Sequence, residues 1–131
     1  MILGIGIDSV EINRFSEWHT YTQKKLHRIF SEQEIEYCLQ QKNKSAERFA
    51  VRFAAKEAFF KAFCSAYPDV YIPFLTMCRF ISTNKIDQRP ILLVDWKNII
   101  KSHENNVMCY VSLTHTQCVA TAFVVVEKKY D

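Results

Sequence analysis

The segment RFAVRFAAKEAFFKAF, at residues 48–63, decides how the rest of the chain is arranged. On a helix, its small residues fall on one stripe and its phenylalanines on another, so the helix is apolar nearly all round. A helix of this kind is buried. After Arg48, with which it begins, four charged side chains nevertheless interrupt the segment, namely Arg52, Lys56, Glu57 and Lys61. An unpaired buried charge costs on the order of several kcal/mol, so these groups need partners, and we hypothesise that the partner is a ligand.

Length and composition are those of an ordinary globular protein. The 131 residues predict a single domain spanning residues 1–131, and the 49% hydrophobic and 24% charged content is typical of a soluble chain. A net charge of +3 is too small by itself to indicate a nucleic-acid partner. No run approaches the roughly 18 apolar residues of a membrane span. Five widely spaced cysteines, without a Cys-x-x-Cys motif or a signal peptide, favour a cytoplasmic protein with reduced thiols.

An alternating strand is predicted at residues 2–7, with Gly4, Gly6 and Asp8 on one face. Glycine inside a strand often marks the close approach of another backbone or of a ligand. A carboxylate above a face without side chains is therefore a candidate metal ligand or a neighbour of a phosphate group. In a second interpretation, Asp8 caps the following helix together with Glu11. A carboxylate has two oxygens, so the two roles are compatible.

Periodicity and turn residues predict a helical first half and a strand-rich second half. The predicted helices cover residues 10–18, 21–30, 31–40, 46–66 and 97–104. The later predicted strands cover residues 77–82, 91–94, 107–114 and 118–127, the last two joined by a hairpin turn at 115–117. Both faces of the last strand are apolar, so both are expected to be covered. The predicted fold class is α+β, with a mostly antiparallel sheet packed on the long buried central helix.

Asp8 and Glu57 come from elements that the glycine face and the alanine stripe allow to touch. Two carboxylates without nearby His or Cys ligands favour a hard cation held by oxygens and completed by water and substrate phosphate, which describes Mg²⁺. Arg52, Lys56 and Lys61 stand around this candidate site as groups that would hold phosphate oxygens. In a simpler interpretation, Glu57 and Lys61 form an ordinary helical pair at i,i+4, worth about a few tenths of a kcal/mol.

The predicted turn after residue 111 concentrates hydroxyl groups and one imidazole. Its polar side chains are Ser112, Thr114, His115 and Thr116. A hairpin tip of this composition binds phosphate or positions a proton acceptor in some proteins. In others, a lone turn histidine is only a solvated loop residue, and this interpretation stays open here.

Taken together, these segments resemble the holo-[acyl-carrier-protein] synthase family of 4′-phosphopantetheinyl transferases. The likeness lies in GIGIDSVEI at residues 4–12 with Arg14, RFAAKEAFFKA at residues 52–62, and VSLTHT at residues 111–116. Phe30-Ser31-x-x-Glu34 also looks like a family motif. Three ordered motifs cover both ends and the middle of the chain, and jointly they are far more specific than any one of them.

The resemblance implies transfer of 4′-phosphopantetheine from coenzyme A to a serine of apo-acyl carrier protein, with release of adenosine 3′,5′-bisphosphate. It implies that Asp8 and Glu57 ligate Mg²⁺ and act in catalysis together with Lys61, which would stabilise charge on the leaving phosphate. Members of this family are usually homotrimers with active sites built across subunit boundaries.

Substrate contacts follow from the same resemblance. The predicted coenzyme A contacts are Arg52, Lys56, Lys61, Ser112, His115 and Thr116. The predicted docking surface for the acidic carrier protein is basic and consists of Arg14, Lys24, Lys25 and Arg28.

Two turns depart from the family pattern. Cys64-Ser65-Ala66 stands where the family has a glycine-containing turn, and Gln88-Arg89-Pro90 lacks the glycine that often precedes this proline. Without glycines that adopt positive φ, these turns are expected to run differently and to alter the pantetheine channel. The alternative function is a non-catalytic module that docks an acidic carrier protein. A nucleic-acid binder is disfavoured because the phenylalanines belong to a buried helix.

Overall fold

The long helix α3 (Ser45–Ala66) forms the axis of the computed structural model, which describes residues 1–100 and 106–130. Its observed limits match the helix predicted for residues 46–66. Phe49, Phe59 and Phe63 are fully buried along it, together with the alanines of the small-residue stripe. Among the described residues, no helix is both long and apolar enough to cross a membrane.

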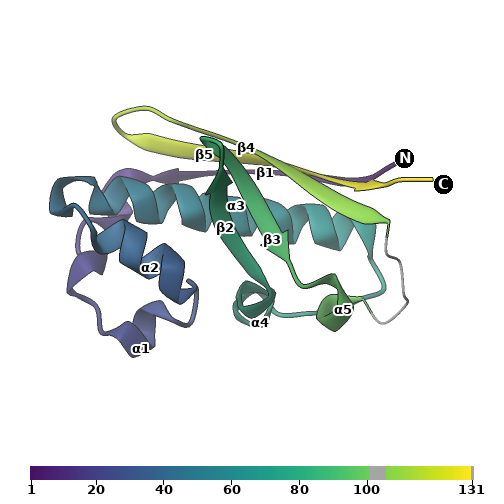
Figure 1. Ribbon diagram of the computed structural model, residues 1–131, viewed down its shortest axis with the longest axis horizontal. Helices are drawn as coiled ribbons and strands as arrows, with labels where there is room; N and C mark the ends of the chain where they lie inside the picture. The colour runs from purple at the N-terminus through teal and green to yellow at the C-terminus, as the bar shows by residue number, and fades with distance from the viewer. Residues whose placement is uncertain (101–105, 131) are drawn as a thin grey trace.

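A three-stranded antiparallel sheet covers one side of α3 (Figure 1). It consists of β1 (Ile2–Glu11), β4 (Val107–His115) and β5 (Val119–Lys128), in the order β1-β5-β4. The predicted hairpin near the C-terminus pairs β4 with β5, and β5 also pairs with β1 so that Asp8 lies opposite Ala122. The predicted α+β class, with a mostly antiparallel sheet packed on a central helix, is confirmed.

Strand β1 lies directly against the backbone of α3 at its two glycines. A Cβ atom added to Gly4 would come within 2.9 Å of Ala66 N, and one added to Gly6 within 2.7 Å of Ala62 N. No side chain fits in that space, which explains why glycines face alanines here. The predicted common face of Gly4, Gly6 and Asp8 is therefore correct. The alternative role of Asp8 as a helix cap is wrong, because β1 continues to Glu11 and the following 3₁₀ turn begins at Ile12.

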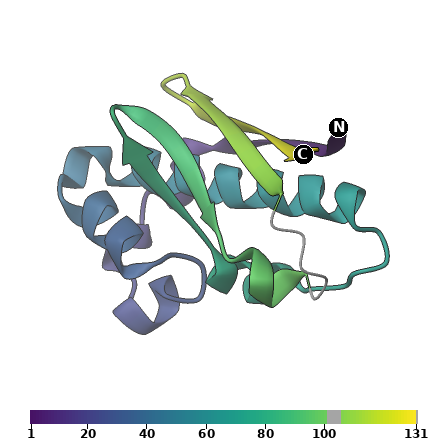
Figure 2. The same ribbon diagram turned by 45° about the vertical axis from the view of Figure 1, so that its right-hand side comes forward.

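The two faces of the sheet have different surroundings. Ala122, Val124 and Val126 of β5 are fully buried against α3. On the outer face, Ile5 is 56% exposed and Ile7 59% exposed. None of the helices in the described residues lies over this outer face (Figures 1 and 2). The prediction that both faces of the last strand are covered is therefore wrong for one chain, because a single chain supplies only one covering layer.

The segment between β1 and α3 is less helical than predicted. Instead of helices at residues 10–18 and 21–30 it forms 3₁₀ turns at Ile12–Phe15 and Trp18–Thr20 and the short helix α1 (Gln23–Leu26). Aromatic packing explains the difference: Trp18 contacts several rings of the core, and this compact arrangement overrides helical periodicity. Helix α2 (Glu32–Leu39) follows, and its predicted capping box is present between Ser31 and Glu34.

After α3, the chain forms a second, two-stranded sheet that crosses the central helix (Figures 1 and 2). Helix α4 (Phe74–Met77) and a 3₁₀ turn (Cys78–Phe80) precede β2 (Ile81–Ile86), so the strand predicted at residues 77–82 begins later than expected. Strand β3 (Arg89–Val94) and helix α5 (Trp96–Ile99) come next. The helix predicted at 97–104 is observed as α5 in its first half, and its second half, residues 101–104, lies outside the described residues.

The β2–β3 turn keeps a tight two-residue form despite its lack of glycine. Asp87 and Gln88 have φ values of 50° and 67°, the left-handed values that such hairpin turns require. The positive φ values that a glycine would readily adopt are thus adopted here by Asp87 and Gln88. Asp tolerates this backbone region better than most residues, whereas Gln88 adopts it at some cost.

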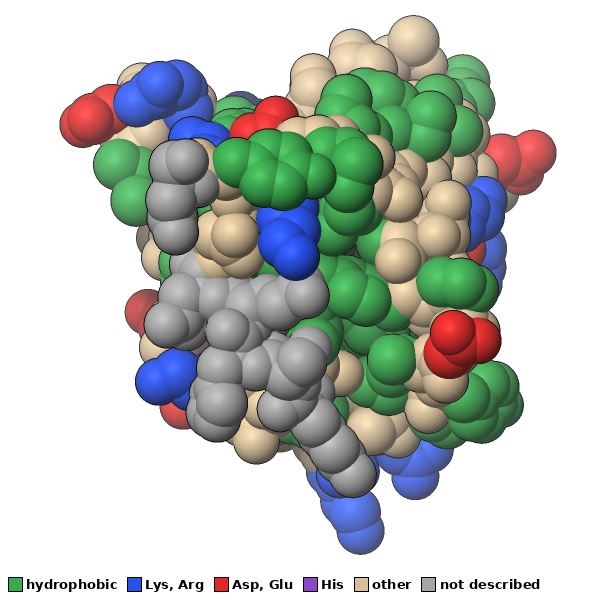
Figure 3. Space-filling model, turned by 90° about the vertical axis from the view of Figure 1, so that its right-hand side faces the viewer, with side chains coloured by type: hydrophobic (Ala, Val, Ile, Leu, Met, Phe, Trp, Pro, Cys, Tyr) green, Lys and Arg blue, Asp and Glu red, His purple; other side chains and the backbone are tan. Residues whose placement is uncertain are grey.

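The two chain ends lie side by side at the far end of the sheet. The Met1 ammonium group donates a hydrogen bond to the Lys128 carbonyl oxygen at 2.8 Å, and the Tyr130 hydroxyl contacts Met1 Sδ at 3.5 Å. Hydrophobic side chains occupy much of the molecular face at this end (Figure 3).

The glycine contact gives a direct test of the fold. Gly6→Ala is expected to lower the free energy of unfolding by about 1–3 kcal/mol, because the new methyl group must separate β1 from α3. Urea unfolding followed by circular dichroism measures this change. The control is Ile7→Val on the opposite face of the same strand, where a change below about 0.5 kcal/mol is expected. An unchanged midpoint for Gly6→Ala would contradict the close packing described above.

Candidate functional site

The two carboxylates expected to share a site do meet in the fold. Asp8 points from β1 toward α3, and its side chain is only 10% exposed. Lys61 Nζ lies 3.1 Å from Asp8 Oδ1 and 3.0 Å from the Ile7 carbonyl oxygen. Glu57, one turn before Lys61, lies close enough to Asp8 for the two carboxylates to interact. We call Asp8, Glu57 and Lys61 the carboxylate site.

The charge balance of the carboxylate site favours a bound cation. Asp8 Oδ2 is buried and has no hydrogen-bond partner. Burial raises the pKa of Glu57, and the neighbouring Asp8 carboxylate raises it further, although Arg14 and Lys61 act in the opposite direction. A divalent cation held by the two carboxylates would give the buried Asp8 oxygen a partner. It would also reduce the repulsion between the two negative charges. These oxygens fit Mg²⁺, with the remaining positions left for water and phosphate oxygens.

The simpler interpretation, an ordinary i,i+4 pair of Glu57 and Lys61, explains only part of the geometry, because Lys61 lowers the pKa of Glu57 but forms its close ion pair with Asp8. Lys61 Nζ pairs with Asp8 across two elements, and no Glu57–Lys61 contact is among the ion pairs of the described residues. Lys61 is half-exposed, so its ammonium group has solvent access beside the two carboxylates. Its position suits interaction with a bound anion.

Arg14 borders the carboxylate site. Its guanidinium carbon lies 5.0 Å from the centre of the Phe53 ring and 5.6 Å from that of Phe15. This stacking fixes a positive charge beside Glu57, whose pKa it lowers. Arg14 therefore lies beside the carboxylate site and is also part of the predicted docking surface.

A second group of charged residues surrounds a cavity of about 320 Å³ between α2, α3, the β2–β3 hairpin and β4. We call it the cationic cavity. Its charged lining residues, with the one histidine, are Lys44, Glu47, Arg48, Arg52, Lys85 and His115. Arg52 is therefore a lining residue, as expected for a group that holds phosphate. Gln88, from the strained turn of the hairpin, also lines this cavity.

The predicted residues of the β4–β5 turn separate in the structure. His115 lines the cationic cavity, and its Nε2 lies 2.7 Å from Glu47 Oε1. Thr116 Oγ1 instead accepts hydrogen bonds from the backbone N–H groups of Cys118 and Val119, so it organises the turn. Ser112 lies opposite Phe123 on the outer face of the sheet, away from the cavity of its own chain.

The predicted role of Lys56 as a coenzyme A contact is wrong. Its side chain is fully buried, and Nζ lies 2.7 Å from Glu34 Oε1. The remaining two donors reach the carbonyl oxygens of Ile29 and Ile81, at 2.7 and 3.0 Å. Glu34 also accepts hydrogen bonds from Thr83. All three donors of Lys56 are thus used inside the protein, so its partner is a buried carboxylate, not a ligand.

The residues predicted to dock a carrier protein are all exposed. Lys24, Lys25 and Arg28 lie on and just after α1, and Arg14 precedes them. Lys25 Nζ lies 3.8 Å from the centre of the Tyr21 ring. The short helix α1 replaces the longer predicted one, yet the basic side chains remain on the surface.

The carboxylate site and the cationic cavity lie at opposite edges of the three-stranded sheet. Asp8 belongs to β1 and His115 to β4, and β5 separates these two edge strands. On α3, Glu57 and Arg52 are five residues apart, which places them about 140° apart around the helix axis. None of the carboxylate-site residues lines the cationic cavity.

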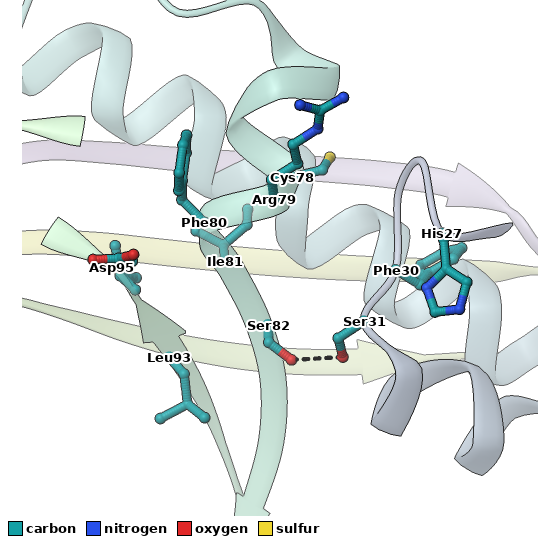
Figure 4. Close-up of a pocket in the computed structure, with 11 residues that line it drawn as sticks. His27, Phe30, Ser31, Cys78, Arg79, Phe80, Ile81, Ser82, Leu93 and Asp95 are labelled. Atoms are coloured by element: carbon teal, nitrogen blue, oxygen red, sulfur yellow. Dashed lines mark hydrogen bonds between the residues drawn. The ribbon is translucent and has the colours of Figure 1, made fainter. Parts of the chain in front are cut away.

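Another cavity, of about 590 Å³, lies where the loop before α2 meets the bases of β2 and β3 (Figure 4). The Ser31 and Ser82 hydroxyl groups share a hydrogen bond of 2.9 Å across it. None of the predicted site residues lines it. Burial raises the pKa of its Cys78 thiol to about 12, so this cysteine is a poor nucleophile there.

Several members of the cationic cavity were not predicted from the sequence. Arg48 had a usable signal, because it stands one helical turn before Arg52 in the segment that decides the fold. Tyr37, Glu47 and Lys85 had none, since their place in the cavity depends on how α2 and the hairpin pack against α3.

Comparisons with known proteins agree with this geometry. The family model described as the 4′-phosphopantetheinyl transferase superfamily matches residues 4–122. A holo-[acyl-carrier-protein] synthase from Treponema denticola is 35% identical over 97% of this chain and 99% of that relative.

Two solved structures extend the likeness to three dimensions. The ACPS–CoA complex of Chronobacterium ammoniagenes matches with a TM-score of 0.79 and 26% identity, covering 97% of this chain and 98% of that one. The holo-(acyl-carrier-protein) synthase of Bacillus anthracis, solved in complex with CoA (3′,5′-ADP), matches with a TM-score of 0.73 and 31% identity, covering 98% and 99%. The chain therefore belongs to the 4′-phosphopantetheinyl transferase superfamily and is an enzyme of that family.

Proposed function

We propose that the chain transfers 4′-phosphopantetheine from coenzyme A to a serine of an apo-acyl carrier protein and releases adenosine 3′,5′-bisphosphate. The observation that carries this proposal is the pairing of Asp8 and Glu57, with an unpartnered buried oxygen on Asp8, in a fold that also holds a cationic cavity. A pyrophosphate ester with a nucleotide end needs both features. Its reacting phosphates need a cation site, and its nucleotide phosphate needs unpaired positive charge.

In this proposal Asp8 and Glu57 hold Mg²⁺. The ion would supply charge neutralisation at the pyrophosphate. Asp8 Oδ2 is a free acceptor for it, and burial together with the neighbouring Asp8 carboxylate raises the pKa of Glu57. The family resemblance implies the same two ligands.

The transfer replaces a phosphoanhydride bond of coenzyme A by a phosphodiester bond to serine. The serine oxygen bonds to the phosphorus that carries pantetheine, the bond from this phosphorus to the bridging oxygen breaks, and adenosine 3′,5′-bisphosphate leaves. Lys61 is suited to neutralise the leaving phosphate, since its ammonium group is half-exposed and borders Asp8 at 3.1 Å. Arg14, held over Phe53, adds a second fixed positive charge.

The proposed active site is completed between subunits of a homotrimer. Within one chain, the carboxylate site and the cationic cavity lie at opposite sheet edges and share no residue. In a closed ring, each subunit presents its β1 edge to the β4 edge of its neighbour, and the two half-sites meet at every boundary. The exposed outer face of the sheet, with Ile5, Ile7 and Phe123, supports such an assembly because a monomer would leave this apolar surface in water.

The carrier protein is proposed to dock beside the carboxylate site. Lys24, Lys25 and Arg28 are exposed and have no carboxylate partner among the described residues. These free cations complement an acidic partner and would steer its approach.

The deciding experiment incubates the protein with coenzyme A, apo-acyl carrier protein and Mg²⁺ and follows the carrier protein by mass spectrometry. We expect the carrier to gain the mass of one phosphopantetheine group, with adenosine 3′,5′-bisphosphate formed in equal amount. Carrier protein that binds without any gain in mass would favour the non-catalytic docking module.

The metal assignment predicts a loss of turnover without a loss of fold. Asp8→Asn and Glu57→Gln should each lower kcat by about 100-fold or more, because each removes one charged ligand. Thermal stability should stay equal or rise, since each change relieves the repulsion between the two carboxylates. Steady-state assays over a range of Mg²⁺ concentrations measure the first effect and calorimetry the second. Glu36→Gln, on the exposed surface of α2, is the charge-matched control. Full Mg²⁺-dependent activity in either variant would remove this assignment.

The docking surface predicts an effect of salt. Lys24→Ala, Lys25→Ala and Arg28→Ala combined should raise KM for the carrier protein by about 10-fold at low ionic strength and less at high ionic strength. KM for coenzyme A should not change. Lys97→Ala on α5 serves as the control for loss of a surface charge. Carrier-protein kinetics identical to those of the wild type would refute this surface.

The shared active site predicts rescue by mixing. Asp8→Asn and Arg52→Ala subunits, each inactive alone, should regain about one quarter of wild-type activity after co-refolding, since each mixed trimer contains one boundary with both wild-type residues. Light scattering should give the mass of three chains. A site contained in one chain would give no recovery at any mixing ratio, which is the result that would overturn the shared arrangement.

A further inference from the structure

Three cations from two elements meet at the side chain of Tyr37, which lines the cationic cavity from α2. The guanidinium carbons of Arg48 and Arg52 lie 4.0 and 4.3 Å from the centre of its ring. Lys85 Nζ, from β2, lies 3.2 Å from its hydroxyl oxygen. Arg48 also donates a hydrogen bond to the Tyr37 carbonyl oxygen at 2.8 Å. One uncharged residue therefore contacts all three positive charges.

None of these three cations has an acidic partner among the described residues. The acid of the cavity, Glu47, is bound to His115. Exposed cations such as Lys24, Lys25 and Arg28 also lack an acidic partner in the described part of the chain, but the fully buried Lys56 has one in Glu34. Arg52 is buried as well, and it lines the cavity without such a partner among those residues.

Arg52 gives independent evidence for a missing acceptor. It is only 8% exposed, and its Nε donor has no partner. Its Nη1 reaches only the Arg48 carbonyl oxygen, at 3.3 Å. A buried donor without an acceptor costs about 1–3 kcal/mol or more when it carries charge, so the site is built for an acceptor that arrives from outside the chain.

An aromatic ring can hold several cations together without neutralising them, whereas a carboxylate cannot. Like charges repel, so a cluster of three cations needs something that holds it together. A carboxylate would occupy the donors and repel an incoming phosphate. The face of a tyrosine ring attracts each cation by about 0.5–2 kcal/mol and leaves the charge and the donors available.

The ionisation of Tyr37 is consistent with unneutralised cations around it. Burial raises the pKa of its phenol, but the hydrogen bond from Lys85 and the charges of Lys85, Arg48 and Arg52 outweigh this effect and lower it.

We propose that Tyr37 is a positioning residue that holds Arg48, Arg52 and Lys85 together, without neutralising them, for the phosphate at the nucleotide end of coenzyme A. This inference rests on the proposed function, because it takes coenzyme A as the ligand of the cationic cavity. Tyr37 acts through the three cations and does not itself react.

The test measures binding of adenosine 3′,5′-bisphosphate by titration calorimetry at several salt concentrations. Tyr37→Leu removes both ring and hydroxyl, so its Kd should rise by about 10-fold and depend less on salt. Tyr37→Phe keeps the ring and loses only the contact with Lys85, so its Kd should rise by only about 2- to 3-fold. For both variants kcat at saturating coenzyme A should stay near the wild-type value, because the carboxylate site is untouched.

The matched control is Tyr21→Leu. Tyr21 is also half-buried and carries a cation over its ring, Lys25 at 3.8 Å, but it does not line the cavity. Its loss should leave the Kd for the nucleotide unchanged. Equal binding by Tyr37→Leu and the wild type overturns the inference alone. Failure of the wild type to bind the nucleotide overturns the proposed function and the inference with it.

A spectroscopic measurement covers the case in which Tyr37→Leu fails to fold. Tyrosinate absorbance is titrated with pH for the wild type and for Tyr37→Phe, and the difference reports Tyr37. Adenosine 3′,5′-bisphosphate should shift this difference titration to higher pH, because the bound phosphate neutralises the cations that favour tyrosinate. A difference titration that does not move on addition of nucleotide contradicts the inference.

Discussion

The contact between strand β1 and helix α3 is the constraint on which the rest of the structure depends. At Gly4 and Gly6 the strand backbone lies against the helix backbone, with Ala62 and Ala66 opposite. No other residue type fits on the strand side. Because the two backbones touch, Asp8 at the next inward position of the strand is brought to Glu57 and Lys61 of the helix. Tight packing between two small-residue faces is therefore what assembles the carboxylate site.

Charged residues on the same helix have opposite roles, and packing decides between them. Lys56 is buried and satisfied by Glu34 and two carbonyl oxygens, so it ties α2, α3 and β2 together. Breaking a buried pair of this kind by removing one partner is strongly destabilising, by about 3–5 kcal/mol. Lys61, five residues further on, is half-exposed beside Asp8. The first lysine stabilises the fold, whereas the second is placed for a ligand.

The carboxylate site and the cationic cavity differ in the sign of their charge. The carboxylate site carries excess negative charge and an unpartnered oxygen, which is the environment that attracts a cation. The cationic cavity carries excess positive charge held around an uncharged ring, which is the environment that attracts phosphate. They lie on opposite edges of one sheet whose outer apolar face is exposed, and the proposed completion of the site by a neighbouring subunit rests on this arrangement.

Sequence alone determined the central helix, the glycine face, the final hairpin, the fold class and the partnership of Asp8 with Glu57, because each depends on residue type and period along one element. The sequence did not predict the features that depend on packing between elements distant along the chain. Lys56 and Arg52 lie one helical turn apart and look alike in sequence, yet Glu34 reaches only Lys56. Aromatic packing of Trp18 replaced predicted helices with turns, and the strained Gln88 kept a turn for which glycine was expected. Tyr37, Arg48 and Lys85 become one site only when α2, α3 and β2 come together. Local pattern fixes the face on which a side chain lies, whereas its charge partner depends on the tertiary structure.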